Sequence, residues 1–383
     1  MATILSKFRR QESYERKAGF CQSNCLNPAV AAFIIFAIFY SVAPAFSKEK
    51  SRIASNTLPL SINATINKRT GNSPKVLAWK SRNKAKATII CLHALGLSSH
   101  AYNDLGQALS EHDFEVYAMD ARGFGKNRKI DGLDKLDLDR TVVDLKQLID
   151  CLLNENPDRK IFLIGESMGG AIALKAASKY PNLIKGLMVS APAYKLYKTK
   201  RLTLKNFGDI VTPGLGPAAK SFIRQATSSQ KLRDHWLKDP DNHKLQLSFG
   251  EALSYYRFVR NTPRYSAKIK ALPICIMHGL KDHLAPPQGS ARLFSNIASS
   301  EKLLVIDCEA EHLLLEEKQL TNRILALSID WLNQKLAQPK AKSYKQLLIL
   351  KNNTLDVVDQ EMIRDIRKKS GVRLHNANSG SMI

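Results

Sequence analysis

The sequence predicts an α/β fold in which a mostly parallel central sheet is flanked by helices on both faces. First, short apolar runs alternate with segments of helical spacing from about residue 76 to about residue 190. Second, the run Thr88–Leu92 is continuously apolar, which is typical of a central parallel strand covered on both faces. Third, a short apolar run at 161–164 leads through a Gly-x-Ser-x-Gly turn directly into a helix of small residues.

The other elements follow from the same periodicities. The stretch 138–154 is an expected helix because Val142, Leu145, Leu148 and Leu152 recur at helical spacing. Further helices are expected at 101–110, 168–180 and 320–336, and strands at 76–79, 87–92, 115–119, 161–164, 186–190, 273–278 and 303–307. Functional side chains of such a sheet gather at the carboxyl ends of its strands.

The turn around Ser167 is the motif that predicts chemistry. In a nucleophile elbow the serine lies on a strained turn between strand and helix, with its hydroxyl presented at the end of the strand. Gly165 and Gly169 fit this turn because a Cβ at either position would collide with neighbouring backbone. The helix that starts at Met168 directs its N-terminal amides toward the same point. The alternative is a glycine-rich turn with an incidental serine.

A serine hydroxyl needs a base to take its proton, and the base needs a carboxylate to orient it. In sheets of this class the order along the chain is serine, acid, histidine. Ser167, Asp282 and His312 occur in that order, each after an expected strand. They are the predicted nucleophile, orienting acid and base.

Other acids and histidines fit the order less well. His278 and His283 flank the acid but come too early in the chain to be the base. Asp307 and Glu309 precede His312 too closely to reach its ring easily. Asp120 follows an earlier strand and is expected to brace the loop after it.

An oxyanion formed at the attacked carbonyl needs two amide donors. The N–H of Met168, directly after the serine, is one candidate, and the N–H of Leu95 is the other. His93 is expected to shape the loop that carries Leu95. No metal or organic cofactor is expected; Cys21 and Cys25 have no further ligands nearby.

The chain is strongly basic, with 58 Lys and Arg against 34 Asp and Glu and a net charge of +24. Such an excess favours anionic membrane surfaces or nucleic acid as partners, and no nucleic-acid motif is present. We therefore expect a membrane surface as a partner and no nucleic acid; the alternative is that the charge serves solubility only.

The N-terminal region predicts a membrane anchor. Residues 1–28 form a basic segment, and residues 29–46 carry no charge, a length at the lower edge of what spans a bilayer. The excess positive charge before this run places the catalytic domain on the extracytoplasmic side. Alternatively, Ala43-Pro44-Ala45 is a cleavage site of a signal sequence, and the protein is secreted or periplasmic. A buried helix is the third possibility.

The chain then divides into three further parts. A polar linker is expected at 47–75, the catalytic domain at 76–338 and a basic tail at 339–383. Strand–helix alternation breaks at about 193–268, which predicts a helical cap inserted into the domain. The cap is either a lid with an apolar inner face for an acyl chain, or a stabilising excursion. The tail carries an amphipathic piece near 355–369, or is poorly ordered.

Taken together, these motifs resemble the α/β-hydrolase superfamily and, within it, the monoacylglycerol lipase/lysophospholipase branch of serine aminopeptidase S33-type hydrolases. The resemblance covers about residues 76–334. Its motifs are Cys-Leu-His-Ala-Leu-Gly at 91–96, Asp-Ala-Arg-Gly-Phe-Gly at 120–125, Gly-Glu-Ser-Met-Gly-Gly at 165–170, His-Gly-Leu-Lys-Asp at 278–282 with a proline at 286, and Glu-His-Leu-Leu-Leu-Glu at 311–316. The chain departs from the family at Ala94, where a glycine is usual, and at 123–127, where Gly-His-Gly-x-Ser is usual.

The resemblance implies a serine hydrolase that cleaves a carboxylic ester through an acyl-enzyme. Ser167 is the implied nucleophile, His312 the base and Asp282 the orienting acid, with the amides of Leu95 and Met168 as the oxyanion hole. The expected substrate is lipid-like, a monoacylglycerol or a lysophospholipid. The alternatives are a catalytically silent lipid- or partner-binding protein, and a peptidase or acyltransferase with the same triad.

Overall fold

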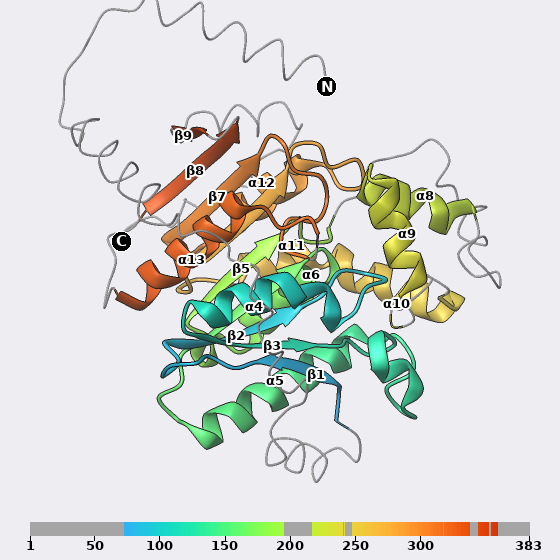
Figure 1. Cartoon of the computed structure of the whole chain (residues 1–383), viewed down its shortest axis with the longest axis horizontal. Helices are drawn as coiled ribbons and strands as arrows, with labels where there is room; N and C mark the ends of the chain where they lie inside the picture. The colour runs from blue at the N-terminus through green and yellow to red at the C-terminus, as the bar shows by residue number, and fades with distance from the viewer. Residues whose placement is uncertain are drawn as a thin grey trace, which may run out of the picture. The chain divides into compact units, whose positions relative to one another are not determined.

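The computed structural model describes residues 73–194, 217–239, 241, 247–316, 318–337, 344–351 and 354–358 (Figure 1). The basic segment 1–28, the expected anchor or signal sequence 29–46 and nearly all of the linker 47–75 lie outside these residues. None of the described helices has the length and apolar character needed to cross a bilayer.

A nine-stranded sheet forms the centre of the described chain, with the strand order β1-β3-β2-β4-β5-β6-β7-β8-β9. β1 pairs antiparallel with β3 and β8 pairs antiparallel with β9, whereas all other neighbours are parallel. The strands are β1 (Val76–Trp79), β2 (Ala87–Leu92), β3 (Phe114–Met119), β4 (Ile161–Glu166), β5 (Gly186–Ser190), β6 (Ile274–Gly279), β7 (Glu301–Asp307), β8 (Tyr344–Lys351) and β9 (Thr354–Val358).

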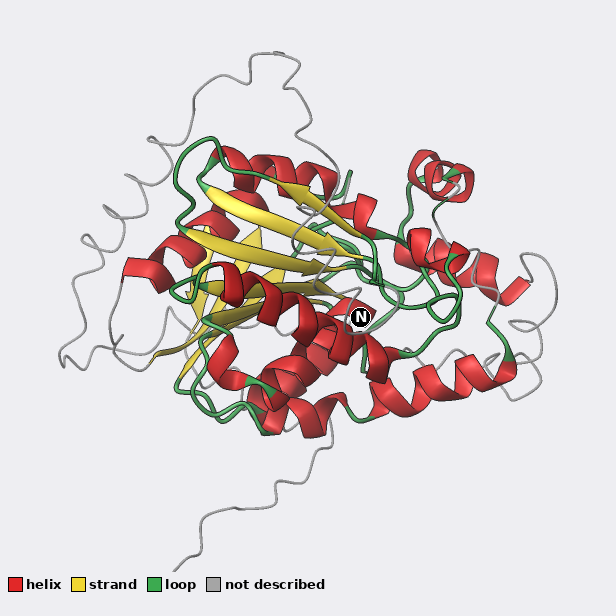
Figure 2. Cartoon of the chain, turned by 90° about the horizontal axis from the view of Figure 1, so that it is seen from below, coloured by secondary structure: helices red, strands yellow, loops and turns green. Residues whose placement is uncertain are grey.

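Helices cover both faces of this sheet, as the views in Figures 1 and 2 show. Side chains of α5 (Leu138–Glu155), α6 (Met168–Lys179) and α12 (Pro287–Asn296) belong to one apolar cluster. Side chains of α4 (Asn103–Glu111) and α13 (Asn322–Ala337) belong to the other. The predicted α/β fold with a mostly parallel sheet is therefore confirmed.

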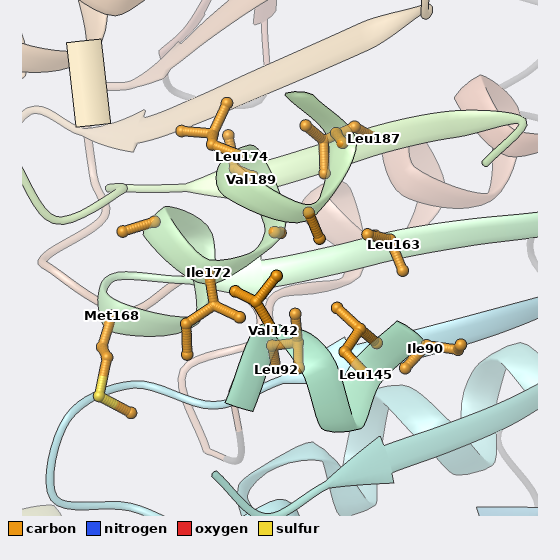
Figure 3. Close-up of a cluster of buried hydrophobic side chains, with 14 of the residues drawn as sticks. Ile90, Leu92, Val142, Leu145, Leu163, Met168, Ile172, Leu174, Leu187 and Val189 are labelled. Carbon is orange, nitrogen blue, oxygen red and sulfur yellow. The ribbon is translucent and has the colours of Figure 1, made fainter. Parts of the chain in front are cut away.

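The central strands are apolar on both faces because both faces are packed. β2, β4, β5 and β6 are buried along their whole lengths. Figure 3 shows Leu145 of α5 beside Ile90 and Leu163 on neighbouring strands, and Val142 of α5 beside Ile172 of α6; all five belong to one apolar cluster. This packing fixes the position in the sheet at which each strand ends, and therefore where the loop after it begins.

The sheet extends further along the chain than the sequence predicts. Residues 344–351 form β8, a parallel neighbour of β7, and residues 354–358 form β9, where a tail beginning at 339 is expected. Leu347 and Leu350 are buried in the apolar clusters on opposite faces of the sheet. The short apolar run at 347–350 therefore belongs to a strand that is packed on both faces of the sheet, and it is not part of an appendage. The rest of the expected amphipathic piece near 355–369 lies outside the described residues.

Among the described residues between β5 and β6, four helices lie within the expected cap at about 193–268. In Figure 1, α8, α9 and α10 lie together, well apart from β8 and β9. Residues 195–216 of this insertion lie outside the described part of the chain. The cap helices are α8 (Pro217–Ala226), α9 (Gln230–Lys238), α10 (Phe249–Arg260) and α11 (Thr262–Ala267).

Candidate active site

Ser167 lies on a sharp turn between the end of β4 and the start of α6. Its backbone has φ of 50° and ψ of −111°, which is a strained conformation for a residue with a side chain. A Cβ added at Gly165 would overlap the backbone of Gly169, and one at Gly169 would overlap the carbonyl of Leu92. The two glycines are therefore needed for the close approach of α6 to β2 and β4.

Three side chains that are far apart in the sequence meet at this turn. Nε2 of His312 lies 3.0 Å from Oγ of Ser167, and Nδ1 of His312 lies 2.7 Å from Oδ2 of Asp282. Asp282 follows β6 and His312 follows β7, so both come from carboxyl ends of parallel strands. Their exposed fractions are 5% for Ser167, 2% for Asp282 and 2% for His312.

The hydrogen bonds define the tautomer of His312. A carboxylate only accepts, so the Nδ1–H of His312 donates to Asp282, and Nε2 is left to accept from the hydroxyl of Ser167. Burial opposes a charge on His312, but the adjacent Asp282 carboxylate outweighs burial and raises the pKa of the imidazole. Burial also disfavours the Asp282 carboxylate, yet His312 and His278 lower its pKa far below the usual value.

Asp282 accepts hydrogen bonds at both of its oxygens. The amides of Leu284 and Ala285 donate to Oδ1 at 2.7 and 2.8 Å. Nε2 of His278 lies 3.0 Å from Oδ2, the same oxygen that His312 contacts. The sequence-based prediction gives His278 no contact with the acid, and its four-residue spacing from Asp282 is the signal that could have found this contact.

The tautomer of His278 also follows from its neighbours. Its Nε2 faces two acceptors, Asp282 and the carbonyl of Ala285 at 3.2 Å, so Nε2 carries a proton. Its Nδ1 lies 2.7 Å from Oγ of Ser290 on α12. His278 thus contacts the carboxylate oxygen that His312 contacts, Ser290 contacts the other nitrogen of His278, and His278 and Ser290 are both about 1% exposed.

Backbone hydrogen bonds join the loop that carries Asp282 (280–286, the acid loop) to the loop that carries His312 (308–316, the base loop). The amide of Leu280 donates to the carbonyl of Asp307 at 2.7 Å, and the amide of Lys281 donates to the carbonyl of Ala310 at 3.0 Å. A Cβ at Gly279 would overlap the carbonyls of Ala310 and Glu311. This backbone contact fixes the distance between the carboxylate and the imidazole.

The alternative acids have other partners. Asp307 forms two hydrogen bonds with Arg323, at 2.5 and 2.9 Å, and Glu309 pairs with Lys281 at 2.7 Å. Asp120 accepts the amides of Ser99 and Lys126, which agrees with its expected role of bracing a loop.

His93 anchors the loop that carries Leu95. Its Nε2 accepts from the amide of Ala121 at 3.0 Å, so its Nδ1–H donates to the carbonyl of Ala94 at 2.8 Å. Burial lowers the pKa of this imidazole, and both nitrogens already have partners. The ring therefore connects the loop after β2 to the loop after β3, and Leu95 directly follows the anchored residue.

Two buried glutamates bind the loop that carries His312: Glu316 connects it to the loop after β2, and Glu166 connects it to the end of β4. The amide of Ala94 donates to Oε1 of Glu316 at 2.6 Å. Glu166 accepts the amides of Leu314 at 2.6 Å and Glu316 at 3.1 Å, and the amide of Leu315 lies within 3.3 Å of both its oxygens. Neither glutamate has a role among the sequence-based predictions, although Glu166 precedes the serine and Glu316 ends the last motif.

The cap contacts the base loop next to His312. Oε2 of Glu311 accepts from the hydroxyl of Thr227 at 2.7 Å, and the amide of Ser228 donates to both carboxylate oxygens at 2.9 and 3.0 Å. Thr227 and Ser228 lie in the link between α8 and α9. The position of these two helices is thereby coupled to the residue that precedes the imidazole.

A mostly parallel sheet with helices on both faces, and a Ser–His–Asp arrangement at its carboxyl edge, define the class of α/β-hydrolases. Within that class, residues 83–319 match the family described as Serine aminopeptidase, S33, and the chain belongs to this family.

The relatives with assigned functions include lipases and esterases. The monoglyceride lipase of Mus musculus is 28% identical over 270 residues, which cover 68% of this chain and 86% of that protein. The monoacylglycerol lipase of Mycolicibacterium smegmatis is 24% identical over 226 residues, 58% of this chain and 80% of that protein. The chain is accordingly a carboxylic ester hydrolase.

Solved structures agree on the fold. The monoacylglycerol lipase of Paleococcus ferrophilus superposes with a TM-score of 0.55 at 24% identity and covers 68% of this chain and 98% of its own. A soluble variant of monoglyceride lipase from Saccharomyces cerevisiae, in complex with a substrate analog, gives a TM-score of 0.56 at 18% identity, with coverage of 78% and 100%.

Proposed function

We propose that this protein cleaves the carboxylic ester of a lipid-like substrate, a monoacylglycerol or a lysophospholipid, with Ser167 as nucleophile. The observation that carries the proposal is the continuous chain of contacts from Asp282 through His312 to Ser167, at 2.7 and 3.0 Å. The similarity to monoglyceride lipases over about two thirds of the chain supports the substrate class.

The chemistry follows from the tautomer of the imidazole. As Oγ of Ser167 attacks the ester carbonyl carbon, its proton passes to Nε2 of His312, and the positive charge formed on the ring is stabilised by Asp282. The carbonyl oxygen becomes an anion that the amides of Leu95 and Met168 stabilise. When this intermediate collapses, the alcohol leaves with the proton from His312 and the acyl group stays on Ser167.

Water completes the cycle in the same site. His312 takes a proton from a water molecule, the hydroxide attacks the acyl carbonyl, and the second tetrahedral intermediate releases the fatty acid. Ser167 recovers its proton from His312. This sequence requires no redox partner and returns the enzyme to its starting protonation state.

We also propose a role for the cap and a membrane location for the enzyme. The cap acts as a lid over the acyl chain, and its attachment at Glu311 places it beside the base. The net charge of +24 supports work at an anionic membrane surface, with residues 29–46 as anchor and the domain extracytoplasmic. A cleaved signal and a secreted or periplasmic enzyme is the alternative.

A substrate panel tests the proposal. The purified full-length protein and its Ser167→Ala variant are compared on a monoacylglycerol, a lysophospholipid and an aminoacyl anilide, with product measured by mass spectrometry. We expect hydrolysis of a lipid ester by the wild type and none by the variant. Turnover of the aminoacyl anilide alone would instead favour the peptidase reaction that the family description names.

A further inference from the structure

Two glutamate side chains lie buried near the loop after β2 that carries Ala94 and Leu95, the proposed oxyanion loop. Glu166 is 0% exposed and Glu316 is 1% exposed. Glu316 contacts this loop through the amide of Ala94, and Glu166 contacts the base loop through the amides of residues 314–316. A pair of carboxyl groups in such a place is costly, because burial disfavours an ionised carboxylate and two like charges repel each other.

The two carboxyl groups differ in their hydrogen bonds. Glu166 accepts from three backbone amides, which is the environment that stabilises a carboxylate. Glu316 accepts from one amide at Oε1, and its Oε2 is buried without a hydrogen-bond partner in the described part of the chain. An unpaired oxygen is far less costly on a neutral carboxyl than on an ionised one.

The surroundings of the pair point the same way. In the described part of the chain, the side chains that act on the pair are Tyr102 after β2, Cys91 on β2, Ser190 at the end of β5 and His312 after β7. Among the described residues no lysine or arginine forms an ion pair with either carboxyl. Burial first, and then the Glu166 charge, raises the pKa of Glu316 well above its usual value. Burial raises the pKa of Glu166 as well, but there the hydrogen bonds from the amides of Leu314 and Leu315 and the neighbouring His312 oppose the rise.

We propose that Glu316 is a positioning residue that works as a neutral carboxylic acid: its carbonyl oxygen holds Ala94, and thereby the amide of Leu95, in place for the oxyanion. This inference rests on the proposed function. It means that an uncharged side chain, Glu316, holds the oxyanion loop through the amide of Ala94. The neutral state matters because the ester carbonyl becomes an anion on the same loop. An ionised Glu316 would be a second buried anion beside Glu166, and it would oppose the charge on the ester oxygen in a medium of low dielectric constant.

Matched substitutions at the two glutamates test the charge assignment. Glu316→Gln keeps an acceptor for Ala94 and cannot ionise, whereas Glu316→Leu removes the acceptor. Glu166→Gln makes the same chemical change at the carboxylate, where the new amide group would face backbone donors. All three variants and the wild type are assayed for kcat and KM on one ester from neutral to alkaline pH.

We expect Glu316→Leu to lower kcat on the order of 100-fold with a smaller change in KM, because the oxyanion loop loses its anchor. The kcat of Glu316→Gln should stay within a few-fold of the wild-type value. This variant should also lack the loss of activity that ionisation of Glu316 causes at alkaline pH. Glu166→Gln costs much more than Glu316→Gln.

The opposite asymmetry, with Glu166→Gln tolerated and Glu316→Gln inactive, would overturn the assignment, and so would an unchanged alkaline limb in Glu316→Gln. The comparison of the two glutamine variants decides the matter even if Glu316→Leu does not fold. Failure of the proposed function is distinguishable, because the wild type itself would then hydrolyse no ester. In that case the pH dependence of folding stability still reports the charge on Glu316.

Discussion

Nε2 of His278 lies 3.0 Å from Oδ2 of Asp282, and the same oxygen accepts from His312 at 2.7 Å. One carboxylate oxygen therefore divides its charge between two imidazoles. Because the attraction between Asp282 and His312 raises the pKa of the base, a second donor on the same oxygen moderates that rise. We therefore expect His278, with Ser290 behind it, to moderate the basicity of His312.

Replacing His278 should change the pH dependence of hydrolysis. In His278→Leu the charge of Asp282 acts on His312 with less competition, so the pKa of His312 rises further. The base must be neutral to take the serine proton, and activity is lost as the pH falls through this pKa. The acidic limb of kcat/KM is therefore expected to move to higher pH. His278→Gln, whose amide N–H can reach the same oxygen, is the control and should move the limb less. An identical limb in wild type and His278→Leu would rule out this role.

Gly279 should tolerate no side chain. A Cβ there overlaps the carbonyls of Ala310 and Glu311, so Gly279→Ala forces the acid loop away from the base loop. A displacement of about 1 Å between catalytic groups costs on the order of 100-fold in rate. We expect a loss of that size in kcat.

Gly250 provides the matched control for this substitution. It lies in α10, and the space that an added methyl group would occupy is open, so Gly250→Ala should leave kcat near that of wild type and stabilise the helix by up to about 1 kcal/mol. Thermal unfolding and kcat of both variants check the pair. Full activity of Gly279→Ala would show that the two loops separate without consequence.

Glu311 should matter more for stability than its neighbour Glu309. Glu311 binds the hydroxyl of Thr227 and the amide of Ser228, whereas Glu309 forms a surface ion pair with Lys281. Glu311→Ala is expected to lower the free energy of unfolding by about 1–3 kcal/mol, and Glu309→Ala by less than about 1 kcal/mol. Chemical denaturation measures both. Equal effects would mean that the cap is not held at this point.

Glu316 should make the folded protein less stable as the pH rises. Its pKa is raised in the folded state, so between the unfolded value of about 4.3 and the folded value only the folded protein carries the proton. The free energy of unfolding then falls with rising pH across this window. Glu316→Gln removes this contribution, and its stability should decline less from about pH 5 upward, as thermal unfolding across that range would measure. Parallel curves for the two proteins would indicate an ordinary, ionised Glu316.

The sequence predicts the parts of the site that local motifs encode. The turn at Ser167 requires Gly165 and Gly169 within four residues, and Asp282 and His312 each follow an apolar strand directly. Strand ends on one edge of a parallel sheet meet in space, so three local patterns suffice to place three distant side chains together.

The contacts that could not be predicted from the sequence are long-range. Ala94 and Glu316 are 222 positions apart, and Glu166 and the amide of Glu316 are 150 apart. No periodicity relates such positions, and a buried glutamate in the sequence looks like a solvated one. β8 is missed for a related reason: its apolar run follows a helix and a basic stretch, and only its pairing with β7 shows that the sheet continues.

The central claim is that Asp282 and His312 make the hydroxyl of Ser167 an effective nucleophile. The most direct measurement is labelling of the full-length protein with a fluorophosphonate, followed by mass-spectrometric mapping of the modified peptide. The account predicts one adduct on Ser167, and its loss in His312→Ala while that variant unfolds at the wild-type temperature. An unlabelled wild-type protein, or an adduct on another residue, would contradict it.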